Sequence, residues 1–425
     1  MNRDDAADVG LDWYVSDPPG AGGELKTRPE DFRVEEQSTF SYGDTGRYAV
    51  LRVTLRNRDT HRFARDLSNA LGVSRRRVRW AGTKDRRAVT TQLYTVDVAD
   101  EDVGSIDVEG AEIELLGRAD HSIGLGDLRG NRFEVVARDV ERPGELERVD
   151  RELDERDGPA NLYGSQRFGS RRPISHDVGR HVLRDDFEAA VEAYVGAPGA
   201  GEPTRTARAR ERYREQRDPK EALDYYPGHL GYEKALLNAV VAGDSHREAF
   251  GRLPHNLRRM FVNAVQSQAF NLVVRERYRE GLGLRTAHEG DVVCFVSDGV
   301  PDVDRLQRVT ESNVDAVQRH VDRGRAHVTA PLVGSDTELS EGEQGEIERD
   351  VLEDLGLEAR DFDRDDEYGS RGSRRPIALD VDVERLVEDD VARFEFALPS
   401  GSYATVVLRE YLKNDLTAAV PPDAA

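Results

Sequence analysis

Residues 81–92 read AGTKDRRAVTTQ, a short polar segment that leads into a pattern typical of a β-strand. Asp85 stands between Lys84 and the pair Arg86-Arg87. Flanking cations favour the charged form of a carboxyl group, so we expect Asp85 to be ionised. An ionised carboxylate on a loop can bind a cation, form a structural ion pair in a turn or attack an electrophilic carbon. The segment alone leaves these alternatives open.

The segments around this loop predict a sheet with interspersed helices. Thr60 is suited to cap a helix that carries apolar residues at four-residue spacing and ends at Gly72. Little βαβ regularity is present, which favours the α+β class with a mixed or antiparallel sheet. We expect strands over residues 24–36 (with a turn at Pro29), 48–55, 91–98, 111–116 and 132–138, a turn-rich connector over 125–131, and a helix from Pro143 to about Arg156.

The middle of the chain has a different pattern, with charged helical segments over 178–220 and a long helix over 254–280. A buried strand at 291–296 and a helix near 311–322 follow, and the acidic block 341–366 predicts a solvated face or a mobile linker. The strand pattern returns from Arg374, with a strand at 391–398, followed by an apolar helix or strand through Tyr411. We therefore expect a catalytic sheet domain formed by residues 1–174 and 375–425, with a mostly helical domain inserted at 175–374.

Composition limits the cellular setting and the class of chemistry. The chain of 425 residues has a net charge of −22, and its 61 basic residues include only five lysines, which favours a protein kept soluble in concentrated salt. One cysteine excludes an internal disulfide, and the scattered histidines lack metal-ligand spacing, so no metal site is predicted. No apolar run is long enough to span a membrane and no signal-peptide pattern is present, so we expect a cytoplasmic protein.

Two enzyme classes fit poorly. The GTPase motif [NT]-K-x-D needs a residue between lysine and aspartate, whereas Lys84 and Asp85 are adjacent, and a Walker A sequence is missing. A glycosidase needs a second carboxylate near the first, and no other acid stands in a comparable setting.

A second segment, residues 161–169, reads NLYGSQRFG and combines aromatic, amide and arginine side chains. Aromatic rings stack on unpaired bases, amides read base edges and arginine binds phosphate. A turn with core aromatics is the alternative. Basic residues gather near both segments against an acidic background, as at a nucleic-acid site, namely Arg75-Arg76-Arg77, Arg79, Arg86-Arg87, Arg167 and Arg171-Arg172.

Taken together, these segments resemble the TruD family of tRNA pseudouridine synthases. The resemblance rests on five motifs in family order, and the middle of the chain matches more weakly. The motifs are Leu25-Lys26 with Pro29-Glu30-Asp31-Phe32, residues 81–92, Gly130-Asn131, residues 161–169, and residues 398–405 (LPSGSYAT).

The resemblance implies a cofactor-free isomerisation of uridine to pseudouridine, at position 13 of tRNA. It also implies that Asp85 is the catalytic carboxylate and Lys26 its ion-pair partner. Phe32, Asn161 and Tyr403 would contact the target nucleotide, and Tyr163 would pack against its base. Tyrosines stand at 163 and 403 where bacterial relatives carry phenylalanine, so the rings are kept and hydroxyls are added. The carboxylate could attack C1′, act at C2′ or add to C6, and the sequence does not choose.

The expected partner is therefore tRNA, with no membrane or metal, and we expect a monomer. The main alternative is a non-catalytic tRNA-binding or chaperone-like module on the same scaffold. A phosphate-ester hydrolase is a third interpretation, and it would depend on a metal ion.

Overall fold

The computed structural model describes residues 1–99, 103–104, 106–124, 126–156, 158–169, 171–297 and 299–414. Among the described residues two compact units form: unit 1 comprises Met1–Asp17 and Glu152–Leu379, and unit 2 comprises Pro18–Arg151 and residues 380–414. The first division falls within helix α4 (Gly144–Glu155). These limits differ from the domain limits expected at 174 and 375, which stay a prediction. Residues 415–425 of the expected catalytic domain lie outside the described part of the chain.

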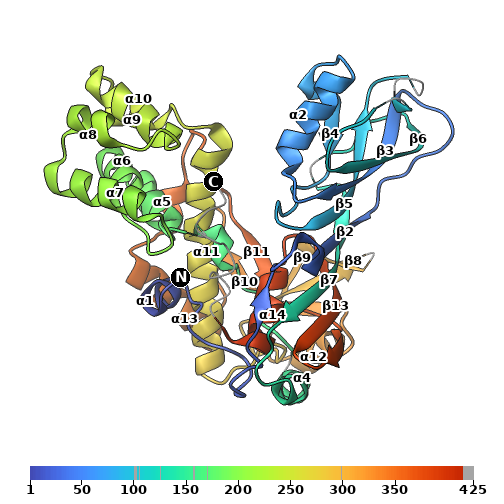
Figure 1. The fold of residues 1–425 in the computed structure, drawn as a ribbon. Coiled ribbons are helices and arrows are strands. Elements are labelled where there is room, and N and C mark those ends of the chain that lie inside the picture. Colours follow the sequence, from blue (N-terminus) through green and yellow to red (C-terminus); the bar gives the residue numbers. More distant parts are fainter. Residues whose placement is uncertain are drawn as a thin grey trace. The chain divides into compact units, whose positions relative to one another are not determined.

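Unit 2 is built on a nine-stranded sheet (Figure 1). Its main path runs β12-β13-β7-β2-β5-β3-β6, while β1 pairs with β7 and β4 pairs with β5. The β2–β5 pair is parallel and the other pairs are antiparallel, so the sheet is mixed as expected. The strands are β1 (Glu24–Leu25), β2 (Phe32–Ser38), β3 (Tyr48–Arg56), β4 (Val78–Trp80), β5 (Val89–Val96), β6 (Ala111–Ala119), β7 (Leu128–Arg138), β12 (Glu384–Glu388) and β13 (Val391–Pro399).

Two helices cover one face of this sheet. Helix α2 (Thr60–Ala70) packs Phe63 edge-on against Tyr94 of β5, with ring centroids 5.1 Å apart. Helix α14 (Ala404–Leu412) packs Tyr411 against Phe394 of β13 at 5.4 Å. Strands with alternating apolar residues bury one face and leave the other in water, as β13 does with its strict alternation of buried and exposed positions. The period of two therefore determines which side chains reach the core.

Two expectations for unit 2 need correction. The α2 cap is Asp59, whose Oδ1 accepts from the Arg62 amide at 2.8 Å, and Thr60 is instead the buried first residue of the helix. Both residue types cap helices, and local sequence could not rank them. Strand β7 begins at Leu128, so the expected connector is shorter than predicted. Leu125, its first residue, lies outside the described residues. The last segment, left open between helix and strand, is helix α14.

Unit 1 is organised around α11 (His255–Arg279), a helix with an extended buried face. Helix α5 (Ser175–Leu183) approaches it closely at Gly179, where an added Cβ would lie 2.2 Å from the Phe261 carbonyl oxygen. The other helices are α1 (Arg3–Asp8), α6 (Phe187–Gly196), α7 (Thr204–Gln216), α8 (Pro219–Tyr225), α9 (Gly231–Val241), α10 (His246–Phe250), α12 (Val314–Val321) and α13 (Gly342–Leu355). Figure 1 shows α5 to α10 gathered beside one end of α11.

A four-stranded sheet of order β11-β10-β8-β9 completes unit 1. Its strands are β8 (Val292–Ser297), β9 (Val300–Arg308), β10 (Ala326–Leu332) and β11 (Ser373–Pro376). The sequence predicted β8 and a return of the strand pattern from Arg374, but not β9 or β10. Helices and sheets are thus segregated in both units, and the α+β class is confirmed. No helix among the described residues is long and apolar enough to cross a membrane.

The acidic block contains a packed helix. Helix α13 buries Ile347, Val351 and Leu352 along one side, so the expectation of a mobile linker is wrong for these residues. Glu348 is fully buried on the same helix and pairs with Arg374 at 2.9 Å. Arg374 belongs to β11 and also donates to Thr329 of β10. These partners are distant in the chain, so the local sequence around Glu348 could not reveal them.

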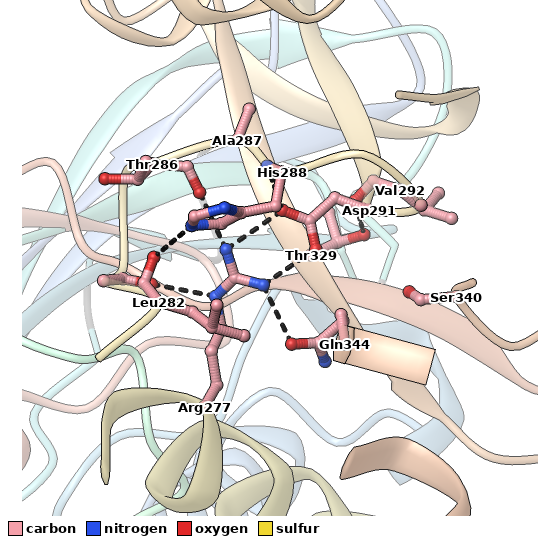
Figure 2. A network of polar contacts seen from close by, with 12 residues as sticks. Arg277, Leu282, Thr286, Ala287, His288, Asp291, Val292, Thr329, Ser340 and Gln344 are labelled. Carbon is pink, nitrogen blue, oxygen red and sulfur yellow. Dashed lines mark hydrogen bonds and ion pairs between the residues drawn. The ribbon is translucent and has the colours of Figure 1, made fainter. Parts of the chain in front are cut away.

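A fully buried arginine anchors the end of α11 (Figure 2). The Arg277 guanidinium pairs with Asp291 through two nitrogen–oxygen contacts of 2.7 and 3.0 Å. Its remaining donors reach the Gly283 and Thr286 carbonyls and Gln344 Oε1, at 2.7 to 2.8 Å. All five guanidinium hydrogens therefore have acceptors, which is the condition under which a buried charge is tolerated.

Candidate active site

The loop that joins β4 to β5 carries Asp85, and four hydrogen bonds hold the residues just before it. The Gly126 amide donates to the Ala81 carbonyl at 3.0 Å, and Gln92 Nε2 donates to the Gly82 carbonyl at 3.0 Å. Lys84 donates its amide to Thr60 Oγ1 at 3.2 Å and its Nζ to Glu36 Oε2 at 2.6 Å. The main chain before Asp85 is thus tied to α2 and to the sheet.

Asp85 forms the ion pair that the resemblance implies. Its Oδ2 lies 3.3 Å from Lys26 Nζ, and its side chain keeps 34% of its surface exposed. Lys26 directly follows β1 and has a left-handed backbone with φ 57°. Its Nζ also lies 4.1 Å from the centroid of the Phe32 ring, an arrangement that attracts a cation to the π face. One ammonium therefore contacts both the carboxylate and the ring.

The other two predicted residues of unit 2 are Phe32 and Tyr403. Phe32 begins β2, is 1% exposed and packs edge-on against Phe133 at 6.1 Å. Tyr403 is the half-buried residue that precedes α14, after the turn that ends β13. Four of the six predicted residues thus belong to unit 2.

Asn161 and Tyr163 belong to unit 1, and Arg375 joins them there. Arg375 Nη2 donates to Asn161 Oδ1 at 2.5 Å, and its Nε donates to the Asn161 carbonyl at 3.2 Å. Asn161 Nδ2 donates to the Pro376 carbonyl at 2.9 Å. Both ends of the amide are therefore oriented by β11, and its carbonyl end is the one that faces the guanidinium.

The Tyr163 ring contacts both a cation and another ring. The Arg375 guanidinium carbon is 4.4 Å from its centroid, and Phe270 packs edge-on at 5.6 Å. The main chain of Tyr163 exchanges two hydrogen bonds with Asn271 of α11, at 2.8 and 2.9 Å. Tyr163 is 5% exposed, so its position is determined by packing as well as by hydrogen bonds.

Sequence reasoning missed three residues that hold these groups: Arg375, Asn271 and Glu36. Their partners lie between 48 and 214 positions away in the chain, so no local spacing could connect them. One predicted arginine has another role. Arg172 donates to the carbonyls of Tyr194 and Ala197 at 2.7 and 2.9 Å, so its guanidinium serves the fold of unit 1.

A group of possible metal ligands also forms in unit 1. His176 Nε2 lies 2.6 Å from Asp8 Oδ2 and 3.8 Å from Asp177 Oδ1, while Arg180 donates to Asp177. The hydrogen bond from His176 holds the pKa of Asp8 below its usual value, although burial opposes it. An arginine thus already donates to one of the two carboxylates, and the side chains are joined in a polar network.

A polar hollow of about 600 Å³ lies beside β9 and β11 in unit 1. Arg308 and Arg371 line it together with Asp304 and Asp336, so its charges largely cancel. None of the six predicted residues lines this hollow, and the Asp85 loop remains the stronger candidate.

Comparison with known proteins identifies the family. The model of the family "tRNA pseudouridine synthase D (TruD)" matches residues 8–411. Proteins named "Probable tRNA pseudouridine synthase D" are 49% identical in Halobacterium salinarum (95% of this chain, 96% of that protein) and 48% identical in Natronomonas pharaonis (96% and 97%). The crystal structure of TruD from Methanosarcina mazei superposes with a TM-score of 0.84 at 39% identity, covering 96% of this chain and 98% of that one. The chain belongs to the TruD family of tRNA pseudouridine synthases.

Proposed function

We propose that this protein converts uridine 13 of tRNA to pseudouridine, with Asp85 as the catalytic carboxylate. The observation that carries the proposal is the Lys26–Asp85 ion pair, in which a partly exposed carboxylate sits on a tethered loop. The family match over residues 8–411 supports the same proposal, because the chain that carries this ion pair belongs to the TruD family.

The reaction is an isomerisation, so every atom of the nucleoside is retained. The N1–C1′ bond breaks, the uracil turns, and a C5–C1′ bond forms; C5 loses a proton and N1 gains one. A carboxylate can assist by attacking C1′, by removing a proton at C2′ or by adding to C6. All three routes need a carboxylate that can reach the nucleoside, and the partly exposed Asp85 side chain, 3.3 Å from Lys26 Nζ, supports this assignment.

The aromatic and amide residues take the binding roles in this proposal. A target nucleotide leaves its stack at a cost of a few kcal/mol, and contacts in the pocket offset part of it. We assign Phe32, Tyr403 and Asn161 to the target nucleotide and Tyr163 to its base. Arg375 supports the last two assignments, because it holds the amide and the ring in fixed orientations.

Exposed arginines in unit 2 support RNA binding. Arg76, Arg79 and Arg86 lie at the surface on or near the strand and loop that lead to Asp85. A guanidinium pairs with phosphate through a planar fork of donors, which keeps such contacts effective when long-range attraction is weak. On a chain of net charge −22, local basic clusters are the regions suited to a polyanion.

The test follows the hydrogen that leaves C5. Transcribed tRNA carrying tritium at C5 of uridine should release tritium to water with the wild-type protein. A carbodiimide adduct should map to position 13, and a transcript with cytidine 13 should release none. Asp85→Asn keeps the shape of the side chain and removes its charge, so it should bind tRNA but release no tritium. Asp44→Asn, at an exposed site of unit 2, is the matched control.

The alternative, a non-catalytic tRNA-binding or chaperone-like module, gives a different pattern. Wild-type protein would then bind tRNA without releasing tritium. Normal turnover by Asp85→Asn would reject the assignment of the carboxylate while leaving the reaction in place.

A further inference from the structure

The buried face of the unit 2 sheet carries one row of polar side chains. Glu36 of β2 is paired with Asn131 of β7. On the other side of β2, Gln92 of β5 follows one residue after the Glu35–Thr91 pair, so it lies beside Glu36. We call Asn131, Glu36 and Gln92 the polar row.

The polar row interrupts a largely apolar surface. Two residues away along the same strands, the side chains on this face are Val34, Phe133, Tyr94 and Thr90, all buried, and Thr90 carries only a small hydroxyl. A polar group in such a place costs free energy unless it is hydrogen-bonded. The row therefore needs a partner from outside the sheet, and the Asp85 loop supplies it.

Lys84 is that partner. Its Nζ lies 2.6 Å from Glu36 Oε2, and the two side chains are 5% and 0% exposed. Gln92 binds the loop as well, through the Gly82 carbonyl. Glu36 Oε1, Gln92 Oε1 and Asn131 Oδ1 are buried and accept no hydrogen bond from any described residue. This surplus of acceptor oxygens favours a cation at the row.

The identity of the cation is informative. Only five of the 61 basic residues are lysines. Two of the five are next to Asp85: Lys84 precedes it in the chain, and Lys26 forms its ion pair. An ammonium is a compact charge, whereas a guanidinium is a broad plane. Space at Lys84 is limited, since a Cβ added to Gly82 would lie 3.3 Å from its Nζ. The site fits lysine and has little room for the larger group.

We propose that the Glu36–Lys84 pair is a positioning device that sets the place of Asp85. Lys84 precedes Asp85 directly, so fixing its main chain and its side chain fixes where the next residue begins. Glu36 and Lys84 touch no reacting atom in this scheme and act through the loop. The proposal rests on the proposed function, because it presumes that Asp85 takes part in the reaction.

Single-turnover kinetics with enzyme in excess separate positioning from stability. While folded enzyme stays in saturating excess over the labelled tRNA, the rate constant of tritium release reports the chemistry of folded molecules, and a melting curve of the same sample reports stability. Glu36→Gln and Lys84→Met should lower the rate constant by about 10- to 100-fold, the range expected for a misplacement near 1 Å, with tRNA affinity unchanged. Lys84→Arg keeps the charge and should also be slow. Lys220→Met, an exposed lysine in unit 1, should match the wild type.

A double variant sharpens the test. If both residues act through one contact, Glu36→Gln/Lys84→Met should be no slower than the slower single variant, whereas independent effects would multiply. Wild-type rate constants with a lowered melting temperature would show a purely structural pair and overturn the proposal.

Gln92→Met covers the case in which a charge variant does not fold. It removes only the hydrogen bond to the Gly82 carbonyl and leaves the Glu36–Lys84 ion pair, so we again expect a reduced rate constant. Wild-type rate constants in every folded variant would reject the positioning role. Asp85→Asn is measured in parallel: an active Asp85→Asn refutes the proposed function, whereas an inactive one beside fast Glu36 and Lys84 variants refutes only this inference.

Discussion

Lys84 and Asp85 are adjacent in the chain, and each is paired with a residue of opposite charge from a different strand segment. Lys84 Nζ is 2.6 Å from Glu36 in β2, a fully buried contact. Asp85 Oδ2 is 3.3 Å from Lys26, which follows β1 and leaves the carboxylate partly exposed. Lys84 is thus the cation of one ion pair and Asp85 is the anion of another. A rotation of the loop would therefore break at least one of these two pairs. The buried pair holds the loop, and the exposed pair presents the carboxylate.

Lys26→Met should separate the carboxylate's orientation from its presence. The variant keeps an unbranched side chain over the Phe32 ring but removes the charge that contacts Asp85. We expect the single-turnover rate constant to fall by about 100-fold, as for other losses of orientation near 1 Å. Thermal unfolding of the same sample checks that the fold is intact. A wild-type rate constant in a folded Lys26→Met protein would contradict the role assigned to this ion pair.

Arg375→Lys tests the group in unit 1. A lysine keeps the charge but lacks the planar fork of donors that reaches both Asn161 oxygens and lies on the Tyr163 ring. Loss of these partly buried hydrogen bonds should lower the free energy of unfolding by about 1–3 kcal/mol, measured by urea denaturation. The rate of tritium release should fall as well. Arg371→Lys is the control, because that side chain is 88% exposed and should change stability by less than about 0.5 kcal/mol.

Arg277→Met should destabilise unit 1 severely. It would leave the fully buried Asp291 carboxylate without its partner, which costs about 3–5 kcal/mol in comparable buried pairs. Arg279→Met, two residues later and 46% exposed, should cost less than about 1 kcal/mol. Denaturant unfolding compares the two. Equal losses in the free energy of unfolding would show that burial does not determine how much the network in Figure 2 stabilises the protein.

Acid stability should depend on Asp31, which lies just before Phe32. Burial raises its pKa, but hydrogen bonds from the Arg138 side chain and the Arg28 amide outweigh burial and hold the pKa below its usual value. A carboxyl group with a lowered folded-state pKa stabilises the protein above its unfolded pKa of about 3.9, and this stabilisation is lost as the pH falls through the folded value.

Asp31→Asn removes that titration. Its melting temperature should be well below that of the wild type at pH 7, and the gap should close as the pH falls below about 4. Melting curves at pH 7, 5, 4 and 3 measure this, with the exposed Asp382→Asn as control. A gap that stays constant across this range would show that the charge of Asp31 makes no contribution.

The elements with strong periodicity could be predicted from the sequence. The alternation over 391–398 and the apolar spacing over 254–280 correspond to β13 and α11, because burial of one face leaves a period of two or 3.6 in the residues themselves. The strands β9 and β10 were not predicted. Their pairing partners determine them more than their own composition does, as the antiparallel registers of that sheet show.

The sequence by itself determined the family and the α+β class, and its motifs singled out the Asp85 loop on which the proposed function rests. Only the tertiary structure decided which partners hold those residues. Glu36 meets Lys84 across 48 positions and Arg375 meets Asn161 across 214. Such contacts arise when strands and helices bury their apolar faces and bring distant polar groups out of water together. A buried charge must then be paired, and the fold selects the residue that pairs with it.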